Sequence, residues 1–308
     1  MTETLNHRCG WIALAGPPNS GKSTLLNAYL GQKIAIISSK PQTTRNQISG
    51  ILTRPGSQIV FLDTPGLHVK RGLMNRMLMH AARQAIEAAD VLLLILDANR
   101  YAAKPQLLDS GLPHLLSPLA NAQHKPLVIA ANKIDAVKDK KLLLPVLERL
   151  HRQWPQAEIF PISALREEGL PELLDTLSKL LPVQPPMFPE DQVSTVPMRF
   201  MAAEIVREKL FVHLKQELPY SVGVDIDSWE ENADKGLTTI HATIYVARAS
   251  HKSMVIGKAG QLLKTIGTLA RQELEKMLEQ RVHLELWVKV REDWTEDPAF
   301  LRQLGLSS

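Results

Sequence analysis

The residue types needed to hold a nucleotide phosphate gather in one short stretch, GPPNSGKS, at residues 16–23. The stretch fits the pattern G-x-x-x-x-G-K-[ST], with a strand pattern before it and a helix pattern after it. Glycines let the backbone approach an anion closely, and the N–H groups at the start of the helix can donate to phosphate oxygens. We expect Lys22 to contact the β- and γ-phosphates and the Ser23 hydroxyl to bind Mg²⁺. The predicted phosphate-site residues are Gly16, Pro17, Pro18, Asn19, Ser20, Gly21, Lys22, Ser23 and Thr24.

A second motif, NKID at residues 132–135, predicts which base is bound. It follows a buried strand pattern, so we expect it at the same sheet edge as the phosphate loop. The carboxylate of Asp135 can accept two hydrogen bonds from the N1–H and 2-amino groups of guanine, a donor pair that adenine lacks. The Lys133 side chain can lie over the base, and a later Ser-Ala pair can offer backbone N–H groups to the guanine carbonyl oxygen. The predicted base-site residues are Asn132, Lys133, Ile134, Asp135, Ser163 and Ala164.

Two further segments predict the metal site and the parts that respond to hydrolysis. In DTPG, residues 63–66, the first residue can hold Mg²⁺ through a water, and the Gly66 N–H can meet the γ-phosphate. The polar stretch SSKPQTTRNQ, residues 38–47, holds two threonines, of which we prefer Thr44 over Thr43 as the ligand of Mg²⁺ and the γ-phosphate. Such loops are ordered by the triphosphate and released after hydrolysis. The predicted contacts are Asp63, Thr64, Pro65, Gly66 and Leu67, and the predicted Mg²⁺ ligands are Ser23, Thr44 and Asp63.

Leu67 stands where many GTPases carry a glutamine that orients the attacking water. Leucine makes no hydrogen bond with its side chain, so backbone groups or a partner must position the water. His68 is a weaker alternative, since a loop histidine more often faces solvent. We therefore predict slow intrinsic turnover in which Lys22, Thr44 and Gly66 stabilise charge and organise the site, with no general base assigned.

Alternating strand and helix patterns supply the frame for these residues. Strands separated by helices predict an α/β fold with a mostly parallel sheet covered on both faces. The four-residue link at 54–57 is too short for a helical crossover, so one edge strand must be antiparallel. Strands are predicted at 12–15, 48–53, 58–62, 91–96, 127–131 and 158–162, and helices at 22–30, 73–89, 140–152 and 170–181.

A proline-rich stretch, LPVQPPMFPED at 181–191, marks the end of this first half. Proline cannot continue a helix, so an extended spacer is expected, one that lets the two halves reorient. The second half has the order helix 199–217, strand 221–227, strand 238–247, helices 250–280 and strand 282–290. We place a nucleotide-binding domain at 8–181, a linker at 182–196, a second domain at 197–292 and a C-terminal tail at 293–308.

The second half contains the loop Gly257-Lys258-Ala259-Gly260 between two helix patterns. A GxxG loop in this element order is typical of a type II KH domain, in which the glycines admit a nucleic-acid backbone and an apolar groove accepts about four unpaired bases. Ala259 leaves Lys258 as the sole charge in the loop, which would weaken phosphate contact. The predicted RNA contacts are Val255, Ile256, Gly257, Lys258, Ala259 and Gly260.

Apolar residues alternate along the three strands of the second half, which predicts helices on one face of its sheet only. We expect the two aromatic residues of the other face to cover each other or to be covered by the C-terminal tail. That face carries Tyr245 and Trp287 among His241, His283, Glu285 and Lys289.

The composition fits two soluble globular domains. The 308 residues are 44% hydrophobic and 22% charged, and the net charge of +4 leans mildly towards an anionic partner. We find no stretch long enough to cross a bilayer and no secretory signal pattern. A single cysteine, Cys9, excludes an internal disulfide and suits a reducing cytosol.

With these motifs in order, the chain resembles the bacterial Era family of ribosome-associated GTPases over residues 8–295. The resemblance rests on GPPNSGKS, KPQTTR, DTPG, NKID and the SAL turn, and on REKLFVHLKQELPYS (207–221) and HLELWVKV (283–290). It implies a Ras-like P-loop GTPase domain with a six-stranded sheet, then a small type II KH domain, and Mg²⁺-dependent GTP hydrolysis. It further implies binding of the 3′ region of small-subunit (16S) ribosomal RNA, help in 30S subunit assembly, and control of RNA binding by GTP. A cytoplasmic monomer with peripheral contact to the inner membrane is also expected.

Three other classes of protein share part of the pattern. A P-loop ATPase or small-molecule kinase is disfavoured by the guanine motif at 132–135. A GTPase whose second domain binds protein or membrane would need a degenerate GxxG loop. A tRNA-modifying GTPase would need a catalytic cysteine or cofactor site, and we expect Cys9 before the first strand, where it is poorly placed.

Overall fold

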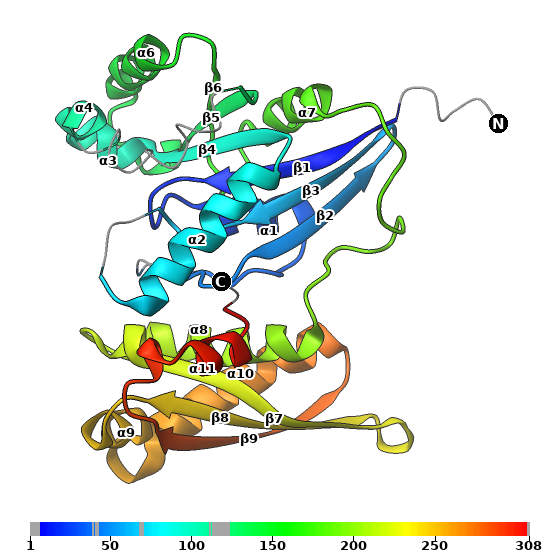
Figure 1. Ribbon diagram of the computed structural model, residues 1–308, viewed down its shortest axis with the longest axis vertical. Coiled ribbons are helices and arrows are strands. Elements are labelled where there is room, and N and C mark those ends of the chain that lie inside the picture. The colour runs from blue at the N-terminus through cyan, green and yellow to red at the C-terminus, as the bar shows by residue number, and fades with distance from the viewer. Residues whose placement is uncertain are drawn as a thin grey trace. The chain divides into compact units, whose positions relative to one another are not determined.

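A computed structural model of the protein describes residues 7–38, 40, 43–67, 71–110, 112 and 124–306 (Figure 1). The chain forms two compact units. The first unit comprises Met1–Ala35, Thr44–Lys70 and Leu78–Thr195, and the second comprises Ile36–Thr43, Arg71–Met77 and Val196–Ser308. Two short segments from the N-terminal half of the chain thus belong with the C-terminal part.

The first unit is built on a six-stranded sheet in the order β2-β3-β1-β4-β5-β6. Strand β2 pairs antiparallel with β3, and every other pair is parallel. The predicted fold class, including the antiparallel edge strand, is confirmed. The strands are β1 (Arg8–Ala15), β2 (Ile48–Arg54), β3 (Ser57–Asp63), β4 (Val91–Asp97), β5 (Leu127–Asn132) and β6 (Glu158–Pro161).

Helices cover both faces of this sheet. Ala13 and Leu94 belong to a buried cluster that also takes in residues of α2, α3 and α6. Helix α1 contacts β2 and β3, and in Figure 1 it lies behind the sheet while α2 lies in front of it. The helices are α1 (Lys22–Leu30), α2 (Leu73–Ala88), α3 (Ala98–Ala103), α4 (Gln106–Ser110), α6 (Leu143–Gln153) and α7 (Leu170–Leu180), with 3₁₀ turns at Ile134–Ala136 and Lys140–Leu142.

Strand β1 begins earlier than its apolar pattern predicts. Arg8, Cys9 and Gly10 already pair with β3. Cys9 therefore lies within β1, not before it, and is fully buried with its Sγ 3.7 Å from Gln58 Oε1. Burial raises the pKa of this thiol, which keeps it protonated and unreactive. A catalytic cysteine of the kind a tRNA-modifying enzyme needs is thus disfavoured.

The proline-rich segment forms no helix, and hydrogen bonds attach it to the first unit. The Ile51 N–H donates to Val193 O at 2.9 Å, and Gln58 Oε1 accepts the N–H groups of Met187 and Phe188 at 2.8 and 3.0 Å. A backbone without helix or sheet can still offer its polar groups to an edge strand such as β2. The first unit runs to Thr195, so the proline-rich segment belongs with it.

The second unit has a three-stranded sheet in the order β7-β8-β9. Strand β7 is antiparallel and β9 parallel to β8, and the order helix-strand-strand-helix-helix-strand is as predicted. The elements are α8 (Met198–His213), β7 (Val222–Asn232), β8 (Leu237–Val246), α9 (Ala249–Ile256), α10 (Gln261–Leu278), β9 (Arg281–Val290) and α11 (Pro298–Gln303), with 3₁₀ turns at Leu218–Ser221, Ala233–Lys235, Lys258–Gly260 and Trp294–Glu296.

The C-terminal tail is partly helical and covers part of the outer face of this sheet. Phe300 of α11 meets Tyr245 edge to face with ring centroids 4.7 Å apart, and Trp294 is fully buried. The expectation of helices on one face only is therefore wrong, while the covering of Tyr245 by the tail is confirmed. Trp287 is not covered and stays 59% exposed. Asp297 caps α11 through the N–H groups of Ala299 and Phe300, a signal that precedes Pro298 in the sequence.

Within the part of the chain that the structure describes, no helix combines the length and the apolar character that a bilayer crossing requires.

Candidate functional site

The predicted nucleotide-site residues of the first unit lie where strands of its sheet end. Residues 16–24 follow β1, 63–67 close β3, 132–135 close β5, and 163–164 follow β6. Strand register brings these ends level, because Leu14 pairs with Asp63 and Asp97 pairs with Asn132. The sheet therefore gathers all four segments at one edge.

The phosphate loop is a close-packed turn with a buried lysine at its end. A Cβ on Gly21, which has φ +101°, would lie 2.2 Å from Asn132 Nδ2, so only glycine fits this point. Lys22 is 6% exposed and its ammonium donates to the carbonyls of Gly16 and Pro17 at 3.2 and 3.0 Å. Burial lowers the pKa of Lys22 to about 8, although the Asp63 carboxylate opposes the shift. A buried ammonium group within a loop of closely packed backbone is suited to binding an anionic ligand.

Three side-chain oxygens converge beside this loop. Ser23 Oγ donates to Asp63 Oδ2 at 2.6 Å and lies 2.9 Å from Thr44 Oγ1. Thr44 Oγ1 in turn lies 3.4 Å from Asp63 Oδ2. Asp63 is fully buried, and its Oδ1 has no hydrogen-bond partner among the described residues. Burial raises the pKa of Asp63, while Lys22 and the two hydroxyls oppose that rise.

This oxygen set fits Mg²⁺. The ion prefers hard oxygen ligands, keeps several waters and takes phosphate oxygens as further ligands, so one carboxylate and two hydroxyls suffice. The unpartnered Oδ1 of Asp63 is an acceptor that a metal-bound water would satisfy. Among the described residues there is no group of three or more His, Cys, Asp or Glu side chains that would hold a metal independently of a phosphate.

The structure separates the two candidate threonines. Thr43 does not join the oxygen set, because its hydroxyl donates to Lys40 O at 2.8 Å within the second unit. Thr44 belongs to the first unit and supplies the hydroxyl near Ser23. Sequence spacing alone does not distinguish neighbouring residues of the same type in a loop.

The DTPG segment rests against the phosphate loop. A Cβ on Gly66 would lie 2.7 Å from Pro18 Cα, and the Leu67 N–H donates to Gly16 O at 3.0 Å. The Leu67 side chain is fully buried in the core of the first unit. The side chain is therefore not exposed to solvent, and His68 lies outside the described residues.

The base motif is tied to the phosphate loop and to the last loop of the sheet. Asn132 Nδ2 donates to Ser20 O at 2.8 Å, and Asn132 Oδ1 accepts the Ala164 N–H at 2.9 Å. Ser163 Oγ donates to Asp135 Oδ1 at 2.6 Å, which fixes the orientation of that carboxylate. Because the Ala164 N–H is already donated, the predicted bond to a guanine carbonyl would have to share or replace the bond to Asn132.

Sequence reasoning missed Asp97 as a member of this edge. Its Oδ2 lies 2.8 Å from Lys133 Nζ, and its Oδ1 accepts the Arg100 N–H at the start of α3. The sequence did contain a signal for this residue, because Asp97 is an acidic residue directly after the predicted buried strand 91–96. The ion pair restricts the orientation of the Lys133 side chain, which is predicted to cover the base.

The GxxG loop of the second unit also has a conformation that requires glycine. Gly257 has φ +74° and ψ −179°, and a Cβ there would lie 2.6 Å from Leu262 Cβ. Lys258 and Ala259 are exposed, and Ala259 adopts a left-handed φ of +51°. Gly260 has φ +76° with open space around it. The loop therefore presents backbone and one cation to solvent.

The structure buries one of the predicted RNA contacts and exposes a neighbouring apolar residue that was not predicted. The Val255 side chain is fully buried in the core of the second unit, because α9 turns it towards the sheet. Met254, its neighbour, is 58% exposed. Half-buried apolar side chains continue from the loop along α10 and β9, at Ile256, Leu262, Leu263 and Leu286. Unpaired bases would require apolar surroundings of this kind.

Comparison with known proteins assigns both units. Residues 11–133 match the family model described as "50S ribosome-binding GTPase", and residues 217–295 match "KH domain". The GTPase Era of Nitratidesulfovibrio vulgaris (strain Miyazaki F) is 57% identical over 307 residues, covering 100% of this chain and 99% of the relative. The chain belongs to the Era family of GTPases. The Era protein of Geobacter metallireducens is 44% identical over 298 residues and 97% of both chains.

Solved Era structures match the whole fold. A variant of Aquifex aeolicus Era bound to GDP and AlF₄⁻ is 40% identical, with a TM-score of 0.89 over 98% of this chain and 100% of that one. Era in complex with MgGDPNP and nucleotides 1506–1542 of 16S ribosomal RNA is 39% identical, with the same TM-score and coverage. Membership of the Era family makes this protein a GTPase with a C-terminal KH domain.

Proposed function

We propose that this protein is a magnesium-dependent GTP switch that binds the 3′ region of 16S ribosomal RNA through its KH unit and assists assembly of the 30S subunit. The observation that carries the RNA part is the loop at 257–260, whose glycine backbone and exposed Lys258 face solvent beside half-buried apolar side chains. The solved Era relative with a bound 16S fragment supports this choice of RNA.

The nucleotide part follows from the geometry of the first unit. Ser23, Thr44 and Asp63 would hold Mg²⁺ directly or through water, which neutralises phosphate charge during hydrolysis. Lys22 would contact the β- and γ-phosphates, and the Asp135 carboxylate, oriented by Ser163, would select guanine. With Leu67 in the core, no side chain of the DTPG loop is assigned to orient water, so we expect intrinsic turnover slower than about 0.01 s⁻¹.

Control of RNA binding by the nucleotide is part of the same proposal. Thr44 and the Gly66 N–H would contact Mg²⁺ and the γ-phosphate only in the GTP state, so their loops change when the γ-phosphate leaves. If the loop conformation of the GTP state favours the conformation of the protein that binds RNA, the GTP state has the higher RNA affinity. Cytoplasmic location, a monomeric state and peripheral contact with the inner membrane remain predictions from the family resemblance.

Fluorescence anisotropy with a short RNA matching the 16S 3′ end tests the RNA assignment. Gly260→Asp places a negative charge in the loop without a clash, because nothing lies within 4 Å of a Cβ there. Gly236→Asp is a matched control, since Gly236 also has a positive φ, +54°, and equally open space, in the turn before β8. Both variants change the net charge equally.

We expect Gly260→Asp to weaken RNA binding at least about tenfold and Gly236→Asp to change it less than about twofold. Equal losses in both variants would contradict the assignment of the loop. Absence of binding by the wild-type protein in every nucleotide state would instead favour a protein- or membrane-binding second unit, with the GTPase assignment unaffected.

A further inference from the structure

The second unit has a groove beside the edge strand β7 of its sheet. Strand β7 is the first strand in the order β7-β8-β9, and within the described residues it pairs with β8 alone. A cavity of about 290 Å³, here called the β7 groove, is lined by residues from 197–204, 224–226 and 303–305. All of its lining residues belong to the second unit, and none belongs to the loop at 257–260.

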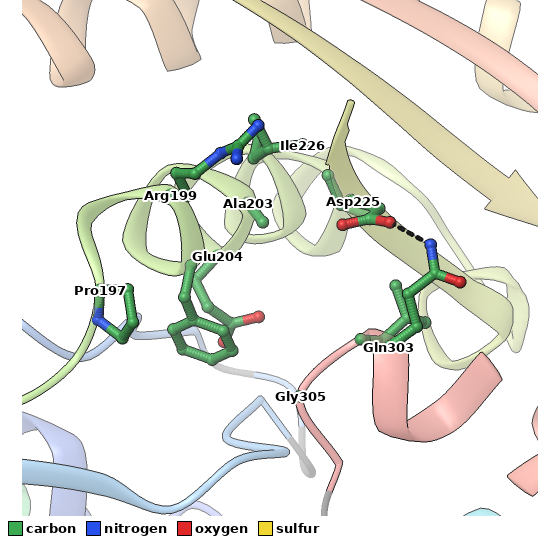
Figure 2. Close-up of a pocket in the computed structure, with 11 residues that line it drawn as sticks. Pro197, Arg199, Ala203, Glu204, Asp225, Ile226, Gln303 and Gly305 are labelled. Atoms are coloured by element: carbon green, nitrogen blue, oxygen red, sulfur yellow. Dashed lines mark hydrogen bonds between the residues drawn. The ribbon is translucent and has the colours of Figure 1, made fainter. Parts of the chain in front are cut away.

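Three segments enclose the β7 groove, as Figure 2 shows. Ala203 comes from α8, Ile226 from β7 and Gly305 from the C-terminal segment. The hydrogen bond from Gln303 Nε2 to Asp225 Oδ2, at 2.6 Å, ties the C-terminal segment to β7. Helix α8 packs on β7 as well. The groove is therefore built from elements that are fixed to one another.

The interior of the β7 groove suits apolar side chains. Phe200, Val224 and Leu304 contribute to its lining. Its buried acid, Glu204, is 5% exposed and already paired, because its two carboxylate oxygens accept hydrogen bonds from Arg207 at 2.6 and 2.5 Å. A paired carboxylate does not require a cationic ligand. The volume lies at the lower limit of typical small-molecule sites, so the interior suits one or two apolar side chains better than a nucleotide.

The two outer strands of this sheet differ in charge. Strand β9, which has half-buried apolar side chains, contains three basic residues and one acid: Arg281, His283, Lys289 and Glu285. Strand β7 contains no Lys, Arg or His and four acids: Asp225, Asp227, Glu230 and Glu231. Negative charge repels phosphate groups and attracts cations, so the β7 edge disfavours RNA and favours a basic ligand.

The hydrogen bonds made by the acids nearest the groove leave their negative charge uncompensated. Asp225 accepts its bond from the neutral amide of Gln303. Asp227 Oδ2 accepts a bond from the hydroxyl of Thr243 at 2.6 Å. Burial raises the pKa of Tyr245, and the charges of Asp227 and Asp225 raise it further. The negative potential of this edge therefore acts on a neighbouring phenol and is available to attract a cation.

The edge of β7 is poorly suited to the addition of another strand. Its register with β8 shifts between Ile226 and Ser228, and a bulge of this kind bends a strand. Bulges and charged side chains commonly protect sheet edges in this way. Next to the bulge, Arg199 Nη2 lies 3.5 Å from the carbonyl oxygen of Asp227. A ligand would therefore be recognised by the apolar interior and the acidic side chains, and not by backbone pairing.

We propose that the β7 groove is a docking site for a basic peptide segment of a protein partner. An apolar side chain of the segment enters the groove, and its lysine or arginine side chains follow the acidic edge from Asp225 towards Glu231. Five strand residues span about 17 Å, so the apolar residue and its basic neighbours fall within about six residues of extended chain. The site is additional to the proposed GTP and RNA functions and rests on neither.

Fluorescence anisotropy of labelled peptides with the full-length protein tests the proposal. The probe is the peptide Gly-Leu-Gly-Lys-Lys-Gly-Lys-Lys, made also in the reverse order. One comparison peptide replaces the leucine by glycine, and another replaces each lysine by glutamate. With Mg²⁺ and GDP at about 0.15 M salt, we expect one order of the probe to bind with a dissociation constant of about 0.1 mM. Loss of the leucine should weaken binding at least about tenfold, and the acidic peptide should not bind.

Two variants of the groove locate the binding. Ala203→Leu fills the groove from α8, and Gln303→Arg places a cation beside Asp225 from an exposed position. Ala299→Arg is the matched control for Gln303→Arg, because it adds the same charge at another exposed position of α11. We expect both groove variants to weaken binding of the probe at least about fivefold and Ala299→Arg less than about twofold.

Two charge-removing pairs test the acidic edge. Asp227→Asn with Glu230→Gln removes two exposed charges of β7, and Glu279→Gln with Asp293→Asn removes two exposed charges elsewhere in the second unit. The edge pair should weaken binding of the probe about threefold, and the control pair less than about twofold. GDP and RNA affinities of all these variants should stay within about twofold of wild type.

Three results would overturn the proposal: a dissociation constant above about 1 mM for both orders of the probe, equal losses in the edge pair and the control pair, or equally tight binding of the acidic peptide. Thermal unfolding checks each variant, and Gln303→Arg decides if Ala203→Leu overpacks the core and unfolds. None of these measurements depends on RNA binding or GTP hydrolysis, so a failure of the proposed function would leave them unchanged.

Discussion

Ser23 Oγ lies 2.9 Å from Thr44 Oγ1, although the two residues come from a helix start and from a polar loop. Both hydroxyls also approach Asp63 Oδ2. Thr44→Ala should therefore lower the rate of GTP hydrolysis about 10- to 100-fold and raise the Mg²⁺ requirement, while GDP binding changes little. Single-turnover hydrolysis across a Mg²⁺ series measures this.

Thr43→Ala is the matched control for that prediction. Its hydroxyl donates to Lys40 O and lies 2.7 Å from Ser38 Oγ, so its loss affects only the loop. A Thr43→Ala effect on Mg²⁺ dependence as large as that of Thr44→Ala would refute the assignment of the ligand.

Guanine selection should depend on Asp135. In Asp135→Asn the amide cannot accept two hydrogen bonds from guanine, which should weaken GDP binding by at least about 100-fold. The amide N–H₂ group can donate to the 2-oxo group of xanthine, so affinity for xanthosine diphosphate should rise. Competition binding with both nucleotides measures the change. Asp139→Asn is the control, because Asp139 only caps a 3₁₀ turn through the Lys141 N–H; unchanged GDP affinity in Asp135→Asn would disprove the assignment.

A glutamine at position 67 should not restore fast hydrolysis. Leu67 is fully buried among core residues, so Leu67→Gln buries an amide and should destabilise the protein by about 1–3 kcal/mol. Urea unfolding and single-turnover hydrolysis of the same preparation test both parts. A rate increase of about tenfold without loss of stability would show that the side chain reaches the water after all.

The two glycines of the RNA-binding loop should differ in how they tolerate alanine. Gly257→Ala brings a Cβ to 2.6 Å from Leu262 Cβ, in addition to the strain of φ +74°, and should cost about 2–3 kcal/mol. Gly260→Ala meets no atom within 4 Å and should cost only about 1 kcal/mol. Denaturant unfolding curves of the two variants give the comparison, and equal costs would mean that the loop can relax around Gly257.

Local patterns predicted most of the first unit because they report on burial and strand ends. The α1 bounds Lys22–Leu30 match the helix pattern, and the antiparallel β2 follows from the short link after it. Each motif lies after a buried strand, so its position at one sheet edge needed no knowledge of distant contacts. The order of helices and strands in the second unit could also be predicted, because it too follows from local sequence patterns.

What the sequence did not predict depends on contacts between distant segments. Helix α11 is short, and the packing of its Phe300 depends on Tyr245, which is distant in the sequence. The attachment of the proline-rich segment depends on Gln58 and on the free edge of β2, not on its own composition. The contact between Arg207 and Thr43 joins residues 164 positions apart, and no periodicity marks either residue as its partner.

The central claim is that the GTPase controls the RNA-binding unit. The most direct test is the dissociation constant of a short RNA matching the 16S 3′ end, measured with a GTP analogue, with GDP and without nucleotide, all with Mg²⁺ at one salt concentration. We predict binding at least about tenfold tighter with the GTP analogue than with GDP, a coupling of about 1.4 kcal/mol. Equal affinity in the three states would contradict the proposed switch.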